Sequence, residues 1–186
     1  MSDYRRWFVP GGMYFFTVVS YDRRPILATD EGRSFLRSAV AKVQRDRPFD
    51  LFATVLLPDH WHLIMQLPPG DAKYSVRMKR IKEEFTQSWL AAGLPEAEVS
   101  ASQAARGERG IWQPRFWEHT IEDVDDLACC VDYIHWNPRK HQVASRIRDW
   151  QWASFHRFVD AGEYEIQWGG TEPKHIQIAR DWGEPL

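Results

Sequence analysis

Residues 51–67 read LFATVLLPDHWHLIMQL, and this stretch decides the fold. Residues 51–57 are mostly aliphatic, aromatic or β-branched, which favours a strand. Pro58 and Asp59 follow as a tight-turn signal, and residues 60–67 return as the next strand. Two adjacent strands joined by so short a turn predict antiparallel pairing.

The flanking sequence supplies the other elements of the fold. Strands are expected at residues 14–20 and 116–121, and helices at about 30–46, 74–92 and 123–137. Pro138 is expected to end the last of these helices, because proline lacks the backbone N–H. This order predicts an α+β fold, a ferredoxin-like or RRM-like antiparallel sheet with helices on one face.

The composition fits one compact domain. The chain has 186 residues, of which 44% are hydrophobic, enough for a single core. We expect the domain to span residues 1–160 and to be followed by a C-terminal tail, 161–186, with a short further element at 150–159. The small, polar residues in 93–115 predict a connection that is either mobile or functional.

The charge and the termini restrict the class of protein. A net charge of −2 argues against a non-specific DNA coat, so any contact with nucleic acid must use a local basic patch. No apolar run is long enough for a signal peptide or a membrane span, so a cytoplasmic protein is expected. The neighbouring Cys129 and Cys130 are expected to be reduced thiols, because adjacent residues of a helix point in different directions.

Two histidines lie on one side of the expected strand 60–67. Side chains alternate along a strand, so His60 and His62 share a face, while the apolar residues at 61, 63, 65 and 67 share the other. Two imidazoles on one side can hold a divalent metal ion such as Mg²⁺ or Mn²⁺ and leave positions open for a phosphate oxygen. The alternative is a pair of surface or packing histidines.

A tyrosine and an amide share a face of the expected helix 123–137. Tyr133 and Asn137 are four residues apart, away from the apolar stripe. Tyr133 could act as a nucleophile with the help of a cation or base, or could simply pack. Asn137 could donate an amide oxygen to the metal ion or cap the helix. The expected stripe on the opposite side consists of Val124, Leu127, Val131 and Ile134.

Basic residues and further polar groups complete the set of candidates. Arg139, Lys140 and His141 lie just past the expected helix end, where they could assist the tyrosine or form a solvated turn. His119 could be an accessory to the site or a structural residue. The tryptophans at 112, 117, 136, 150 and 152 could stack on unpaired bases. The candidate DNA-binding residues, each of which could instead be solvated surface, are Arg5, Arg6, Arg77, Lys79, Arg80, Lys82, Arg139 and Lys140.

Five motifs, in this order and spacing, resemble one family. They are PGGMYFFTVV (10–19), LPDHWHLIMQLP (57–68), RFWEHTI (115–121), VDYIHWNPRKHQV (131–143) and WQWASFHRFVDAGEY (150–164). Over about residues 4–169 the chain is similar to the REP-associated tyrosine transposases, a branch of the IS200-like, single-tyrosine HUH transposases. Gln142 departs from the family pattern, in which glycine is common after the helix.

The resemblance implies an RRM-like HUH nuclease fold and a DNA substrate. Such proteins of bacteria cleave and rejoin single-stranded DNA at or near short palindromic hairpins, the REP elements, which implies a cytoplasmic, nucleoid-associated protein. His60 and His62 match the metal-binding pair, and Asn137 matches the position that completes the metal site. Tyr133 matches the nucleophile, which forms a 5′-phosphotyrosine intermediate and frees a 3′-OH.

Two other functions and two assembly states stay open. The chain could be a domesticated hairpin-binding protein with vestigial cleavage, although a pure binder needs none of these four side chains. It could also be a metal-dependent phosphodiesterase that acts through water. As a homodimer it could supply Tyr133 from the neighbouring subunit, whereas a monomer must supply it within the same chain.

Overall fold

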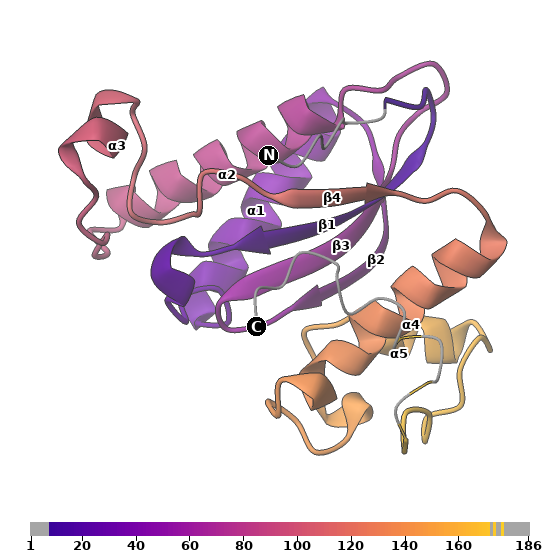
Figure 1. Ribbon diagram of the computed structural model, residues 1–186. Coiled ribbons are helices and arrows are strands. Elements are labelled where there is room, and N and C mark those ends of the chain that lie inside the picture. Colours follow the sequence, from indigo (N-terminus) through magenta and orange to yellow (C-terminus); the bar gives the residue numbers. More distant parts are fainter. Residues whose placement is uncertain (1–7, 172, 174–175, 177–186) are drawn as a thin grey trace.

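The computed structural model describes residues 8–171, 173 and 176 and is built on a four-stranded antiparallel sheet (Figure 1). The strands are ordered β2-β3-β1-β4, so β1 and β3 lie in the centre. This arrangement confirms the predicted α+β, ferredoxin-like class. The strands are β1 (Met13–Val19), β2 (Asp50–Leu56), β3 (His60–Gln66) and β4 (Trp117–Thr120).

Helices cover both faces of the sheet. Helices α1 (Asp30–Asp46) and α2 (Tyr74–Ala91) pack against each other on one face, as the sequence predicts. Helix α4 (Val124–Lys140) packs against β2 and β3 from the other side, next to α5 (Phe155–Asp160) (Figure 1). The expectation that the helices share one face is therefore wrong for α4. The sheet separates two hydrophobic cores, and each face needs its own cover.

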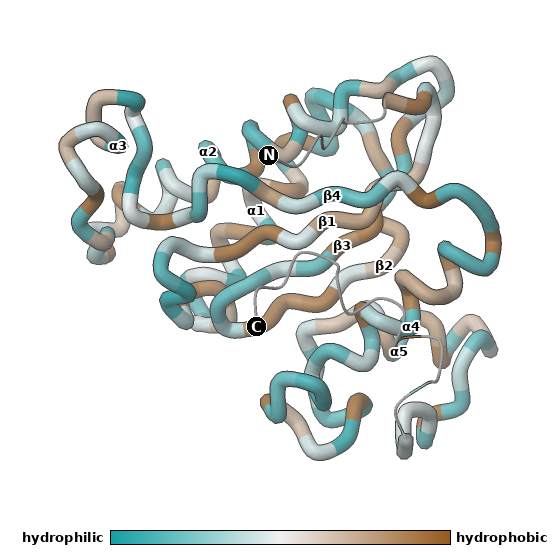
Figure 2. Tube along the Cα trace, in the orientation of Figure 1, coloured by the Kyte–Doolittle hydropathy of each residue, from teal (hydrophilic) through white to brown (hydrophobic). Residues whose placement is uncertain are grey.

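Strand β3 divides its side chains between these two cores. Trp61, Leu63 and Met65 are buried with α1 and α2, while Ile64 is buried with α4. Figure 2 shows hydrophobic residues running along β1, β2 and β3. Burial of each such side chain contributes about 1.5–3 kcal/mol to stability. The alternation that the sequence predicts is confirmed, and it fixes which side of β3 the histidines occupy.

Helix α4 begins and ends differently from expectation. Asp123 caps its start by accepting a hydrogen bond from the N–H of Asp126 at 2.9 Å. The helix then runs through Pro138 to Lys140, so the prediction that Pro138 ends it is wrong. The missing N–H removes one hydrogen bond, but the fixed φ of proline is compatible with a helix and the tertiary packing supports the last turn. The helical conformation is lost by Gln142, two residues after the end of α4. Gln142 has a φ of 55°, a conformation that favours glycine.

The burial of α4 also differs from expectation. Val124, assigned to the buried stripe, is 79% exposed. Farther along, both sides of the helix are covered, so Tyr133 and Asn137 are as deeply buried as Ile134. The sheet covers one side of the helix, and the chain after it covers the other.

The C-terminal part of the described chain closes the free edge of β2. Leu56 donates its N–H to the carbonyl of Trp152, and Ser154 donates its N–H to the carbonyl of Thr54, both at 2.8 Å. Tyr164 and Trp168 pack against the core beneath α4. Capping an edge strand in this way prevents its pairing with other chains. The domain boundary at residue 160 stays a prediction.

The remaining elements are short. Helix α3 (Ala101–Ala105) lies within the long connection, and single 3-10 turns occur at Tyr21–Arg23 and Ile147–Asp149. Cys129 and Cys130 are reduced thiols, as expected. Across residues 8–171, 173 and 176, no helix combines the length and the apolar character needed to cross a membrane.

Candidate active site

The two histidines of β3 lie under α4. His60 and His62 are 1% and 0% exposed, and their ring centres are 4.8 Å apart. They lie on the same side of the strand because they are two residues apart. What the sequence shows as a polar face is therefore an internal site between the sheet and α4.

Hydrogen bonds orient both rings. Asp59 Oδ1 lies 2.6 Å from Nδ1 of His60, and Thr17 Oγ1 lies 3.0 Å from Nδ1 of His62. Burial raises the pKa of Asp59, but hydrogen bonds and charge from His60 and Arg23 outweigh it and hold that pKa at about 2. The ionised carboxylate can only accept, so Nδ1 of His60 carries a proton and Nε2 is the ring nitrogen left to bind a metal ion. This pattern is typical of metal-binding histidines.

Asp59 and Thr17, the two residues that orient the histidine rings, have only weak signals in the sequence. Asp59 directly precedes His60 in the turn, where a carboxylate reads as a turn former. Thr17 is paired with His62 across β1 and β3, and this register exists only in the folded sheet. Strand pairing therefore supplies a contact that no local motif contains.

Helix α4 brings Tyr133 to the histidines, and Asn137 lies one turn farther along the same helix. The Tyr133 ring centre lies 5.4 Å from that of His62 and 5.8 Å from that of Phe15. Asn137 Nδ2 donates to the backbone carbonyl of Tyr133 at 2.8 Å. That bond links the amide and the tyrosine within one turn of the helix. The tyrosine and the His-x-His pair meet within one chain.

A cation lies at the tyrosine hydroxyl. Lys140 Nζ donates a hydrogen bond to Tyr133 Oη at 2.9 Å and lies 4.7 Å from the centre of its ring. An ammonium at this distance stabilises negative charge on a phenol oxygen. The ring of His141 lies 4.7 Å from that of His60. Of the basic residues predicted after the helix, Lys140 and His141 are thus at the site, and both Arg139 and Lys140 lie within the helix itself.

The arrangement fits a divalent metal ion. Asn137 is fully buried, and within the described part of the chain its Oδ1 has no hydrogen-bond partner. A buried amide oxygen without a partner is costly unless something binds it. Together with the imidazoles of His60 and His62 it offers two nitrogen ligands and one oxygen ligand, a set that suits divalent ions.

The candidate DNA-binding residues are spread over both faces of the sheet. Lys79 and Arg80 are 75% and 49% exposed on α2, across the sheet from Tyr133. Lys82 donates to the carbonyls of Gln113 and Pro114, and burial lowers its pKa to about 8. Arg139 donates to the carbonyls of Gly169 and Gly170. Lys140 is exposed and lies at the site, while Arg5 and Arg6 lie outside the described residues.

Arg77 has a structural role instead of the expected DNA contact. It is 2% exposed, and its guanidinium bonds the carbonyls of Arg47, Pro48 and Lys73. It also forms an ion pair with Asp71 at 2.8 Å. All these partners lie in the loops around the start of α2. The guanidinium therefore stabilises the loops around the start of α2. The burial of the Arg77 side chain contradicts the prediction that it contacts DNA.

The fold and the site together define a class. A ferredoxin-like sheet presents a His-x-His pair to a tyrosine on a helix that crosses its face. A metal site beside a hydroxyl nucleophile suits covalent transfer of a phosphodiester. This combination defines a single-tyrosine HUH transposase.

Comparisons with known proteins narrow the class to a family. Residues 9–137 match the family described as "Transposase IS200 like". A REP-associated tyrosine transposase of Escherichia coli K12 is 44% identical over 170 residues, covering 91% of this chain and 92% of that protein. A Haemophilus influenzae Rd protein that bears the same name provisionally is 44% identical over 179 residues, covering 95% of this chain and 98% of that protein.

A solved structure agrees with these relatives. A REP-associated tyrosine transposase bound to a REP hairpin superposes with a TM-score of 0.79 and 40% sequence identity. The match covers 100% of this chain and 99% of that one. The chain therefore belongs to the IS200-like transposase family, in its branch of REP-associated tyrosine transposases. It is an enzyme of a class that works by transesterification and depends on a metal ion.

Proposed function

We propose that this chain cleaves and rejoins single-stranded DNA at or near palindromic, REP-like hairpins through a 5′-phosphotyrosine on Tyr133. The observation that carries the proposal is the meeting of Tyr133 with His62 and Lys140 inside one chain. His62 comes from β3, whereas Lys140 lies on α4, one to two turns after Tyr133 on the same helix. A purely structural tyrosine would not need both partners. A tyrosine that acts as a nucleophile requires a cation near its hydroxyl and a metal-binding histidine near its ring.

The covalent step breaks one phosphoester bond and forms another. Tyr133 Oη attacks the scissile phosphorus and loses its proton, while the bond to the 3′ oxygen of the upstream strand breaks. That oxygen takes up a proton and becomes a free 3′-OH. Lys140 stabilises the negative charge on Oη during the attack. In the reverse step a 3′-OH attacks the phosphotyrosine and releases Tyr133, so rejoining needs no high-energy cofactor.

His60, His62 and Asn137 would hold the divalent ion, which we propose to be Mg²⁺ or Mn²⁺. When bound, the ion supplies Lewis-acid polarisation of the phosphate. Asp59 and Thr17 contact the Nδ1 atoms of the two imidazoles, so Nε2 would be the metal ligand on each ring. Asn137 shares one helical turn with Tyr133, so the same segment of α4 places the nucleophile and an oxygen ligand together.

Hairpin recognition is supported by the solved relative, whose structure is described as bound to a REP hairpin and which aligns with the whole of this chain. The scissile strand would reach Tyr133 from the side of the exposed Lys140. Lys79 and Arg80 are candidates for phosphate contacts outside the site. Lys82 and Arg139 are weaker candidates because backbone carbonyls already accept hydrogen bonds from them. Action on REP-like hairpins would place the protein on chromosomal DNA.

A denaturing gel with end-labelled, hairpin-bearing single strands tests the nucleophile. The wild-type protein with Mg²⁺ or Mn²⁺ should give a covalent protein–DNA adduct, and Tyr133→Phe should give none while it still shifts the hairpin in a native gel. Adducts that persist in Tyr133→Phe would reject the assignment. Cleavage without any adduct would favour the phosphodiesterase, and binding without cleavage would favour a hairpin-binding protein.

The same gel tests the metal ligands. His60→Ala and His62→Ala should each abolish metal-dependent cleavage, because either change removes one of two nitrogen donors. Hairpin binding in a native gel should be largely retained. Unchanged cleavage in either variant would show that the ion is held elsewhere. The assembly state, monomer or homodimer, stays a prediction.

A further inference from the structure

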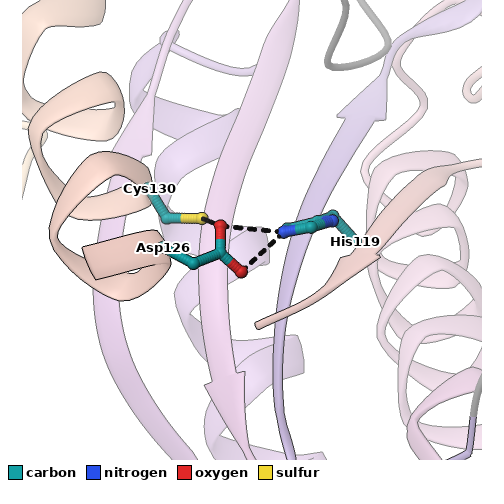
Figure 3. Close-up of side chains that lie close together, drawn as sticks. All are labelled: His119, Asp126 and Cys130. Carbon is teal, nitrogen blue, oxygen red and sulfur yellow. Dashed lines mark hydrogen bonds and ion pairs between the residues drawn. The ribbon is translucent and has the colours of Figure 1, made fainter. Parts of the chain in front are cut away.

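A second group of metal-donor side chains lies at the opposite end of α4 from Asn137. His119 on β4 points toward Asp126 and Cys130, which both project from α4 (Figure 3). One ligand atom from each residue lies within 4.8 Å of the other two. None of the three takes part in the chemistry proposed for Tyr133.

The three donors are held in place by the local structure. Asp126 and Cys130 are four residues apart in the helix and therefore share a face. His119 Nε2 lies 2.8 Å and 3.0 Å from the two carboxylate oxygens of Asp126. The N–H of Glu122 donates to the same carboxylate at 2.9 Å, and Trp117 stacks on the His119 ring with centres 6.1 Å apart. Both the carboxylate and the imidazole are thus oriented before any ion arrives.

Burial and access fit a small ion. Cys130 is 0% exposed, whereas the side chains of His119 and Asp126 are 27% and 19% exposed. An ion can therefore approach from the side of the imidazole and carboxylate and meet the sulfur at the back. Cys130 Sγ donates to Asp126 Oδ1 at 3.8 Å, so the sulfur and the carboxylate already face each other. A cation bound between them would contact both the sulfur and a carboxylate oxygen.

We propose that His119, Asp126 and Cys130 form a second metal site, selective for Zn²⁺ or a chemically similar ion, separate from the His60–His62 site. Imidazole, carboxylate and thiolate are the ligands that Zn²⁺ takes, and three protein ligands leave one position for water. Binding forms a metal–sulfur bond, breaks the S–H bond of Cys130 and releases its proton to solvent. The nuclease site offers no sulfur, so the two sites prefer different ions.

The position of this site gives it a physical consequence. Its ligands join β4 to the first half of α4, while Tyr133 and Asn137 lie in the second half of the same helix. Without an ion, the pair of His119 and Asp126 joins these elements at this point. A bound ion would add bonds across the same junction and tie the tyrosine-bearing helix more firmly to the sheet.

Cobalt spectroscopy tests the proposal on the purified full chain under reducing conditions. Co²⁺ replaces Zn²⁺ in such sites, and a bound thiolate gives a charge-transfer band that a site of histidine and asparagine cannot give. Wild type should show this band with one thiolate-bound Co²⁺ per chain, and Zn²⁺ should bleach it. The band should vanish in Cys130→Ser and remain in Cys129→Ser, the matched neighbour outside the cluster. It should also remain in His60→Ala.

Two further readouts keep the test decisive. Because Cys130 is buried, His119→Ala serves as a second variant with a partly exposed side chain, and its affinity for Co²⁺ should fall at least tenfold. At a free Zn²⁺ concentration 100 times Kd, the Tm of wild type should rise by about 5–10 °C, and that of Cys130→Ser should not. A wild type without the band, or a band lost in Cys129→Ser and kept in Cys130→Ser, would overturn the proposal.

Discussion

Replacing Lys140 with methionine should slow the formation of the protein–DNA adduct about tenfold. The change removes the 2.9 Å hydrogen bond from Nζ to Tyr133 Oη and the charge that lies 4.7 Å from the ring centre, while it keeps an unbranched side chain. A hydrogen bond to a charged group is worth about 1.5–3 kcal/mol. Lys140 is exposed, so the lower value applies, and about 1.4 kcal/mol corresponds to a factor of ten in rate.

The assay is single-turnover adduct formation with protein in excess over a labelled hairpin strand. Saturating protein separates the chemical step from DNA binding, which Lys140 could also affect through a phosphate. Loss of one phosphate contact would lower the slope of log affinity against log salt by about 0.7–0.9. Binding measured across salt concentrations therefore shows how much of the effect belongs to affinity.

Arg139→Met is the matched control. Arg139 is the adjacent cation of α4, but its guanidinium bonds the carbonyls of Gly169 and Gly170 and not the tyrosine. Its loss should leave the adduct rate within about twofold of wild type if the fold is kept. A Lys140→Met rate within twofold of wild type, or an equal loss in Arg139→Met, would refute the role of the ammonium at Oη.

Three more predictions concern the support of the site and the fold. Thr17→Val removes the hydroxyl at Nδ1 of His62 and should weaken divalent-ion binding about 10–100-fold by calorimetry, and unchanged affinity would contradict its positioning role. Arg77→Met leaves Asp71 and several carbonyls without their donor and should cost about 3–5 kcal/mol in denaturant unfolding, whereas a loss below about 1 kcal/mol would show that the corner is held by other contacts. Burial lowers the pKa of His135 from 6.5 to about 3, so in this range the unfolded chain binds a proton that the folded chain does not. Stability is thus present above pH 6.5 and lost as the pH falls, and wild type should lose about 2 kcal/mol more than His135→Asn between pH 7 and pH 5; equal losses would place the titration elsewhere.

The sequence predicted the local structure well where a short-range rule governs it. Alternation along residues 60–67 placed His60 and His62 on one face and the apolar residues on the other, and the sheet confirms it. The order of elements predicted the α+β class, since β-α-β-β-α-β allows few arrangements of the sheet. The i, i+4 spacing put Tyr133 and Asn137 within one helical turn.

The sequence misjudged features that depend on what covers each element. Pro138 looked like a helix end, but the packed last turn keeps α4 helical to Lys140. Arg77 looked like a surface cation in a basic cluster, yet loops far along the chain supply carbonyls that bury it. Charge and propensity are local properties, whereas burial is set by neighbours that are remote in sequence.

The sequence by itself determined the strands and helices and the residue types that carry the chemistry. Hydrophobic periodicity and the identity of metal-ligating side chains are properties of short stretches of sequence. Only the tertiary structure decided that α4 crosses the sheet face opposite α1 and α2. That crossing sets Tyr133 beside His62, and the register of β1 on β3 sets Thr17 against the same ring. The physical reason is that two hydrophobic faces of one sheet must both be covered, and the helix that covers the second face brings its polar residues into the buried space with it.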